Sequence, residues 1–133
     1  MKRILPVVLV AMTMTSCLYV VEPRVDYRDR VVGYYAVDEY SQTYYNWTAY
    51  SIRISRSSQG YDVINIDNFY ASGLRVKAYV RQDAITIPYQ VVDGFEIEGT
   101  GVILGRTIHL DYSVIDRYEW GPTDYLDAEA IRE

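Results

Sequence analysis

The stretch GLRVKAYVR, residues 73–81, alternates between apolar and polar side chains. Successive side chains of an extended chain point to opposite faces, so every second residue shares a face. One face carries Leu74, Val76, Ala78 and Val80, while charged or hydroxylated side chains take the positions between them. The pattern therefore predicts a strand with one face in a core and the other face in water.

The same period of two continues on both sides of this stretch. RTIHLDYSV (106–114) and FEIEGTG (95–101) repeat it downstream, and it begins upstream at Val31. Short turn signals such as Asp93-Gly94 separate the alternating runs. We expect strands at 33–39, 45–55, 60–68, 73–81, 84–91, 95–101 and 106–115, with an irregular eighth near 117–120.

Consecutive short strands joined by tight turns predict an all-β fold, arranged as an antiparallel up-and-down meander of seven or eight strands. A meander leaves two open edges, and closure into a barrel removes both. We therefore expect a closed or nearly closed barrel over residues 31–120, with a β-sandwich as the alternative. Residues 121–133 form an acidic tail, for which we expect a short helix or fraying.

Three local features predict irregular strand geometry. Pro88 lacks the N–H that a strand ladder needs, which indicates a bulge or an edge. Gly99 and Gly101 fall on the inward phase, which suits a sharp bend or the close approach of a neighbouring strand. Asp67 and Asn68 favour a bend between two strands rather than a calcium loop, because their spacing does not follow that of an EF-hand.

The beginning of the chain has the order of a secretory signal. Lys2 and Arg3 precede an uncharged, mostly apolar run from Ile4 to Met14, which is too short to span a membrane. The lone cysteine, Cys17, follows directly after small polar residues and resembles the lipidation site of bacterial lipoproteins. This resemblance implies a signal peptide at 1–16, lipidation of Cys17 and a lipidated tether at 17–30.

The lipoprotein resemblance also implies a location. Two or more acyl chains hold a protein stably on a membrane, so the domain would be anchored permanently. Leu18 rather than Asp after the cysteine points to the outer membrane, and the lack of an acidic cluster in LYVVEPR points to its periplasmic face. A disulfide within the chain is excluded because no second cysteine exists.

Charge excludes further classes of function. The chain carries 13 Lys and Arg against 18 Asp and Glu, and Lys2 and Arg3 are the only charges before Cys17. No basic stripe is present to neutralise phosphates, so we expect no nucleic-acid partner. We expect no cofactor and no metal site, since the single histidine, His109, offers no ligand cluster.

The strongest concentration of binding-type residues is YSQTYYNWTAYSIRIS, residues 40–55. Aromatic side chains with a polar handle recognise sugars, peptides and apolar ligands. The candidate ligand-binding residues are Tyr44, Tyr45, Trp47, Tyr50 and Arg53. Because they alternate across both faces of one strand, some of the rings should remain accessible after the core is built, although a purely structural role in core and cross-strand pairs stays open.

Several stretches resemble the small lipocalin-like (calycin-like) lipoproteins of Bacteroidota. They are GYYAVDEYS, GYDVINIDNFYASGLRVKAYV, ITIPYQ and FEIEGTGVILGRTIHLDYSV. The resemblance implies a meander barrel tethered by lipid.

Three functions remain open at this point. We expect a non-enzymatic envelope lipoprotein whose barrel binds a small ligand. A protein-interaction module of a larger envelope complex is the alternative. A glycoside hydrolase that uses carboxylates such as Glu96 and Glu98 is a third hypothesis.

Overall fold

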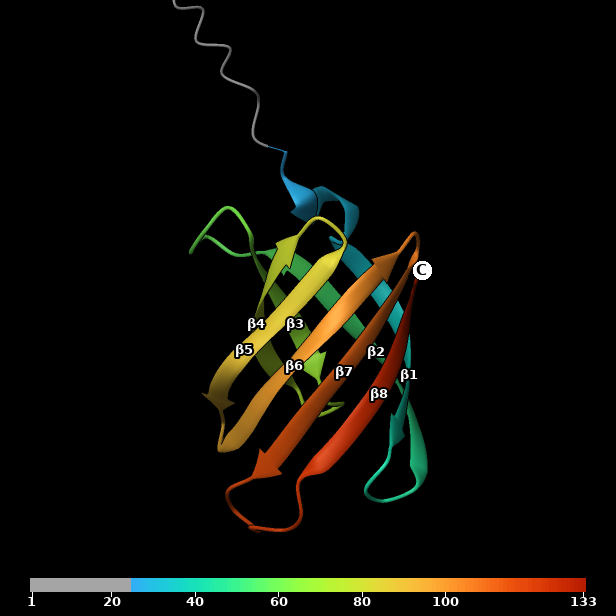
Figure 1. Ribbon diagram of the computed structural model, residues 1–133, viewed down its shortest axis with the longest axis vertical. Helices are drawn as coiled ribbons and strands as arrows, with labels where there is room; N and C mark the ends of the chain where they lie inside the picture. Colours follow the sequence, from blue (N-terminus) through green and yellow to red (C-terminus); the bar gives the residue numbers. More distant parts are fainter. Residues whose placement is uncertain (1–24) are drawn as a thin grey trace, which may run out of the picture.

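Each run of alternating apolar and polar residues forms a strand, and the strands close into a barrel (Figure 1). The structure is a computed structural model that describes residues 25–133. The strands follow chain order around the barrel, each antiparallel to its neighbours, and the last pairs with the first. The elements are η1 (Tyr27–Arg30), β1 (Gly33–Ser41), β2 (Asn46–Arg56), β3 (Val63–Phe69), β4 (Leu74–Arg81), β5 (Ala84–Val92), β6 (Phe95–Leu104), β7 (Thr107–Asp116) and β8 (Asp124–Arg132). The predicted all-β up-and-down meander is confirmed in its closed form, and the β-sandwich alternative is wrong.

The inward phase of every strand fills the barrel with side chains. The four apolar residues of the 73–81 stretch are all buried, as are Ile97 and Leu110 on β6 and β7. Toward the end of the barrel opposite η1, the aliphatic core gives way to rings, and Phe69 packs on Tyr112 at 4.4 Å between centroids. An eight-stranded barrel leaves room for side chains or for one small ligand. Here side chains fill the interior up to this aromatic layer.

Gly99 and Gly101 let β6 and β7 approach each other closely. A Cβ atom at Gly99 would lie 2.4 Å from the Cβ of Tyr112 and 2.5 Å from the carbonyl oxygen of Asp111. At Gly101 it would lie 2.6 Å from Cδ2 of Leu110. At Gly99 no side chain fits without moving the neighbouring strand, and at Gly101 the side chain of Leu110 would have to move aside. The predicted close approach is confirmed.

The two predicted irregularities are β-bulges. The register of β5 against β6 shifts between Ile87 and Gln90, next to Pro88. The side chain of Gln90 then bonds to the backbone of Lys77 on β4, accepting from its N–H at 3.0 Å and donating to its carbonyl at 2.8 Å. A second bulge lies at Asn68, where the register of β3 against β4 shifts and φ is 64°.

The last strand corrects our prediction for the end of the chain. The eighth strand is β8, not a segment at 117–120, and residues 121–133 are not a helical or frayed tail. Its inward positions are filled by Asp124, Leu126, Ala128 and Ala130. Ala, Leu and Glu are good helix formers, but β8 pairs along its length with both β1 and β7. Tertiary pairing overrides the local preference, and the domain extends beyond residue 120.

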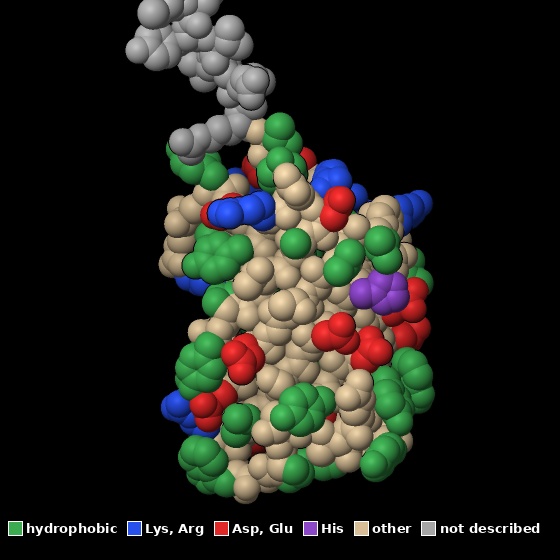
Figure 2. Space-filling view, viewed as in Figure 1, with side chains coloured by type: hydrophobic (Ala, Val, Ile, Leu, Met, Phe, Trp, Pro, Cys, Tyr) green, Lys and Arg blue, Asp and Glu red, His purple; other side chains and the backbone are tan. Residues whose placement is uncertain are grey.

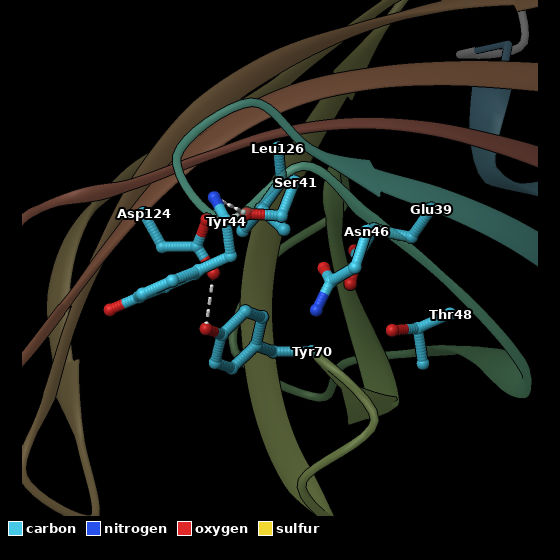
Figure 3. Close-up of a pocket in the computed structure, with 8 residues that line it drawn as sticks. All are labelled: Glu39, Ser41, Tyr44, Asn46, Thr48, Tyr70, Asp124 and Leu126. Atoms are coloured by element: carbon cyan, nitrogen blue, oxygen red, sulfur yellow. Dashed lines mark hydrogen bonds between the residues drawn. The ribbon is translucent and has the colours of Figure 1, made fainter.

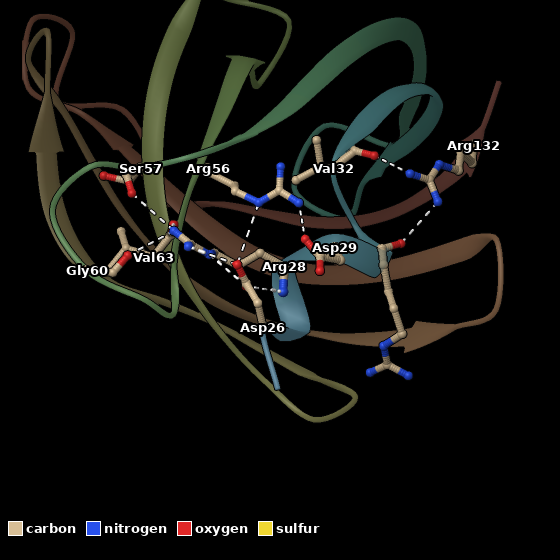
Figure 4. Close-up of polar contacts among 10 residues, drawn as sticks. Asp26, Arg28, Asp29, Val32, Arg56, Ser57, Gly60, Val63 and Arg132 are labelled. Carbon is tan, nitrogen blue, oxygen red and sulfur yellow. Dashed lines mark hydrogen bonds and ion pairs between the residues drawn. The ribbon is translucent and has the colours of Figure 1, made fainter. Parts of the chain in front are cut away.

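The domain also begins earlier than residue 31. Of the segment 17–30 that we expected to be a tether, residues 25–30 are described, and η1 lies across one end of the barrel (Figure 1). Arg28 is buried there, and its Nη1 donates to the carbonyl oxygens of Ser57, Gly60 and Val63 at 3.1, 2.9 and 3.2 Å (Figure 4). This part of the predicted tether therefore belongs to the folded domain.

Candidate functional site

The end of the barrel opposite η1 is open, and we call it the mouth. It is bordered by the β1–β2, β3–β4, β5–β6 and β7–β8 loops, which lie at the bottom of Figure 1. Loops carried by a rigid scaffold are a frequent location for binding residues. The candidate site lies here, above the aromatic layer that ends the core.

Glu39 is a buried carboxylate just inside the mouth. It occupies the inward phase of β1 after Val37, and only 3% of its surface is exposed. Its Oε1 accepts hydrogen bonds from the hydroxyl groups of Tyr50, at 2.7 Å, and of Tyr112. Both tyrosine hydroxyls remain protonated at neutral pH, because burial raises the pKa of each far above the ordinary value. They therefore act as donors that hold Glu39 in one orientation.

Asp124 is a second buried carboxylate, contributed by the first residue of β8. It is 5% exposed, and its two oxygens accept hydrogen bonds from Ser41 Oγ and from the Tyr70 hydroxyl, each at 2.5 Å. Ser41 in turn accepts from the backbone N–H of Tyr44 at 3.0 Å. The strand ends and loops of the mouth are thus tied together through one carboxylate.

The surroundings of Glu39 in the mouth shift the pKa of its carboxyl group upward. Burial raises the pKa of Glu39, and the negative charge of Asp124 raises it further. The hydrogen bonds from Tyr112 and Tyr50 act in the opposite direction and do not offset burial. Neither Glu39 nor Asp124 belongs to any of the ion pairs formed among residues 25–133.

Between the two carboxylates lies a cavity of about 160 Å³ (Figure 3). Figure 3 shows Glu39, Asn46 and Thr48 on one side and Tyr44 and Asp124 on the other. The lining residues are Glu39, Ser41, Tyr44, Asn46, Thr48, Tyr70, Asp124 and Leu126. The lining combines hydrogen-bonding groups with two aromatic rings, which is the composition of a site for a small polar ligand.

A second hollow of about 260 Å³ adjoins the cavity. Tyr44, Tyr70 and Asp124 line both of them, and the ring of Phe95 contributes to the second. Tyr70 packs edge-on against Phe95 at 6.1 Å between centroids. Three aromatic side chains therefore surround the passage from the β7–β8 loop to the buried carboxylates.

The mouth also concentrates backbone strain. Among residues 25–133, seven residues other than glycine have positive φ, and all but Gln82 lie in loops or bulges at the mouth end. Three of them are aromatic, namely Tyr45, Tyr70 and Trp120, with φ between 47° and 59°. Such conformations cost about 1 kcal/mol or more each and cluster at functional sites. The positions where glycine would relieve strain carry large rings instead.

The structure divides the predicted ligand-binding residues between the two faces of the barrel wall. Tyr44 lines the cavity, and Tyr50 points inward to Glu39. Tyr45 and Trp47 are largely exposed on the rim, with Trp47 against Tyr40 at 5.1 Å. Arg53 lies on the outer face, away from the cavity, with its guanidinium 5.8 Å from the ring of Tyr34. The expectation that some rings stay accessible is confirmed, but Arg53 does not join the other residues.

The two carboxylates and Tyr70 are not among the candidate residues predicted from the sequence. Glu39 had a usable signal, because it shares the inward phase of Val37 and is the one charged side chain there. Asp124 gives no such signal, because the composition of residues 121–133 predicts a tail and not a strand. Tyr70 follows the bulge at Asn68, where the change of register hides the direction of the side chain.

The carboxylates that raised the hydrolase hypothesis lie on the outer wall of the barrel. Glu96 forms an ion pair with Arg117 at 3.3 Å and accepts a hydrogen bond from Tyr89 at 2.5 Å. These contacts, the Tyr89 hydrogen bond first, lower the pKa of Glu96, whereas a general acid needs a raised one. Glu98 is exposed on the same wall, pointing away from the mouth cavity.

Two further predictions concern metals and membranes. Among residues 25–133, no group of three or more His, Cys, Asp or Glu side chains is placed to hold a metal ion. Within the same part of the chain, no helix is long and apolar enough to cross a membrane. The predicted signal peptide at 1–16 and lipidation site at Cys17 lie outside the described residues.

The comparisons with known proteins match the fold alone. The chain is similar to a solved structure described as a redesigned β-barrel, with a TM-score of 0.58 and 8% sequence identity. The match covers 83% of this chain and 97% of the designed one. No protein-family model matches the sequence. No curated protein matches it either.

Proposed function

We propose that the protein is a non-enzymatic lipoprotein of the outer membrane, anchored at Cys17 with its domain at the periplasmic face, and that its barrel mouth binds a small ligand. The order of the first 17 residues and the resemblance to lipocalin-like lipoproteins of Bacteroidota support the anchor and its location. The single observation that carries the binding proposal is the cavity between Glu39 and Asp124. Its polar lining lies behind a strained aromatic rim, and both are features of a binding site.

Two observations favour binding over catalysis. Burial raises the pKa of the Tyr50, Tyr70 and Tyr112 hydroxyls, so these groups act as hydrogen-bond donors and not as phenolate nucleophiles at neutral pH. On the outer wall, the ion pair with Arg117 and the hydrogen bond from Tyr89 leave Glu96 with a lowered pKa, which does not suit a general acid. The tyrosine hydroxyls of the mouth are therefore recognition groups.

The alternative function, a protein-interaction module, rests on the rim itself. Tyr118 and Trp120 in the β7–β8 loop are 77% and 70% exposed, and Tyr45 is 80% exposed. Figure 2 shows hydrophobic side chains along the lower edge of the molecule, which is the mouth end. Exposed rings of this kind are frequent at protein interfaces. Pairing through a sheet edge is not available within the barrel, because β1 and β8 close it.

The test purifies the full-length lipidated protein in detergent and identifies small molecules that accompany it by mass spectrometry. Thr48 faces Glu39 across the β1–β2 pair and lines the cavity, so Thr48→Phe should fill the site and abolish co-purification. Ala49→Phe adds the same ring on the outer face of the same strand and should change nothing. A molecule retained equally by Thr48→Phe, or no co-purifying molecule at all, would contradict ligand binding at the mouth.

The anchor has its own test, independent of the mouth. Intact-mass analysis should find a mature chain that begins at Cys17 and carries added acyl mass. Cys17→Ala should leave the precursor uncut or release the domain from membranes. Unmodified wild-type protein that begins at another residue would disprove the anchor.

A further inference from the structure

We propose that the mouth cavity binds a small organic cation, an ammonium or guanidinium group, between Glu39 and Asp124. This inference rests on the proposed ligand-binding function and names the chemical class of the ligand. Four observations carry it: the charge of the lining, the missing partners of the buried carboxylates, the arrangement of the rings and the size of the cavity.

The lining of the mouth is acidic throughout. Within the part of the chain that the structure describes, the cavity and the adjoining hollow together are lined by four carboxylates, and neither is lined by Lys, Arg or His. Asp116 and Glu119 lie on the outer part of the path, while Glu39 and Asp124 lie at its inner end. Clefts lined by one sign of charge concentrate ligands of the opposite sign.

The buried carboxylates lack the counter-charge that buried charges normally have. Burial of an ionised group without a paired charge is costly. Glu39 and Asp124 are 97% and 95% removed from solvent, yet tyrosine and serine hydroxyls are their side-chain partners. Among residues 25–133, neither carboxylate belongs to an ion pair. A cationic ligand in the cavity would supply the missing charge.

The aromatic rings and the volume of the cavity favour a small organic cation over a metal ion. Tyr44 and Tyr70 line the cavity, and ring faces attract ammonium and guanidinium groups. An apolar cavity of about 150 Å³ holds a benzene molecule, so a cavity of about 160 Å³ fits a cation of similar size. An inner-sphere metal ion would need three or more clustered ligands, which the described residues do not provide.

The test compares charged ligands with neutral ligands of the same shape. Calorimetric titration of the full-length protein at neutral pH uses two pairs, choline with 3,3-dimethylbutan-1-ol and n-butylammonium with n-butanol. At least one cation should bind about tenfold or more tightly than its neutral counterpart. Glu39→Gln should remove that preference, while Glu98→Gln, an exposed carboxylate on the outer wall, should leave it unchanged.

A second variant tests the inference independently, in case Glu39→Gln does not fold. Tyr44 is half-exposed and lines the cavity, so Tyr44→Leu should fold normally and reduce the preference for the cation by about threefold or more. If neither cation binds more tightly than its counterpart, or if Glu39→Gln keeps the preference, the inference is wrong. Calcium binding with the same dependence on Glu39 would also overturn it.

The two proposals fail in different ways. Neutral ligands that bind as tightly as the cations, and that Thr48→Phe excludes, would leave ligand binding at the mouth in place and overturn only the choice of a cation. A cation that binds equally well to Thr48→Phe would lie outside the cavity, and both proposals would then be wrong.

Discussion

At the η1 end of the barrel a buried cation is fully partnered, whereas at the mouth two buried carboxylates have no cationic partner. Arg28 bonds to Asp26 through Nε at 2.9 Å and through Nη2 at 3.0 Å, in addition to its three backbone carbonyl acceptors. The side-chain hydrogen bonds between the two groups raise the pKa of Arg28 and lower that of Asp26. Figure 4 shows this network, which Arg56 extends to Asp29.

This difference indicates that the η1 end stabilises the fold, whereas the mouth carries the candidate functional site. Two local rules, a cationic partner for a buried carboxylate or the reverse and a relaxed backbone, hold at the η1 end, where Gln82 is the one residue other than glycine with positive φ among residues 25–133. Both rules are broken at the mouth, where hydroxyl groups take the place of cations beside Glu39 and Asp124 and the rings of the loops lie on strained backbone. Natural proteins depart from these rules chiefly at functional sites. The following experiments test that division.

The largest effect is expected at the closed end. Arg28→Ala would remove a donor from three backbone carbonyls, of which Val63 keeps the N–H of Ser57, and would leave Asp26 with Arg56 at 3.6 Å as its ion-pair partner. We expect the free energy of unfolding to fall by about 2–4 kcal/mol, measured by chemical denaturation. Arg53→Ala is the matched control, because Arg53 lies exposed on the outer wall, and it should cost about 0.5 kcal/mol or less. Equal losses would mean that Arg28 is not the main support of this end.

At the mouth, removal of a buried charge should raise the free energy of unfolding and not lower it. Glu39→Gln keeps a carbonyl oxygen to accept from Tyr50 and Tyr112 but removes the buried negative charge near Asp124. We expect the ligand-free protein to gain on the order of 1 kcal/mol of stability at pH 8. A loss of stability at that pH would show that the carboxylate supports the fold, and the contrast between the two ends would then be wrong.

The gain from Glu39→Gln should depend on pH. A carboxyl whose pKa is raised by folding binds its proton more tightly in the native state. The stability that this provides is complete below the ordinary value of 4.5 and is lost as the pH rises through the raised pKa. The difference between variant and wild type should therefore be small near pH 4.5 and grow toward pH 8. Asp26 and Glu96 have lowered pKa values and act in the opposite direction, but they are common to both proteins and cancel in the difference. A difference that does not change with pH would show that Glu39 does not titrate as we infer.

The smallest effect concerns backbone strain. Tyr45→Gly at the mouth and Gln82→Gly at the η1 end replace residues with φ of 57° and 53°, so both should relieve a similar strain. We expect each to change the free energy of unfolding by about 0.5 kcal/mol in the stabilising direction. Tyr45→Gly alone should weaken ligand capture at the mouth. If both variants bind equally, the strained ring on the rim is not part of the site.

The sequence predicted the barrel wall well because alternation records which face of a strand is buried. The inward phase of residues 73–81 and the tight packing at Gly99 both followed from single strands and their neighbours. β8 was missed because its Ala, Leu and Glu residues favour a helix locally, and its pairing with β1 and β7 depends on closure of the whole sheet. The candidate site was found only in part for the same reason, since Glu39 lies on β1 and Asp124 on β8, and the two strands meet only when the barrel closes.

The pairing of β1 with β8 affects the order in which the protein folds. Seven of the eight strand pairs join consecutive strands and can form as local hairpins, whereas β1 and β8 meet from opposite ends of the domain, as in the pairing of Val37 with Ala130. Pairing over such a separation is slow, because the entropy of the whole intervening loop is lost before any contact compensates for it. Until then β1 and β8 carry unpaired edges that can join other chains. Since β1 supplies Glu39 and β8 supplies Asp124, the two carboxylates come together only when the barrel closes, so the mouth cavity is the last part of the protein to take shape.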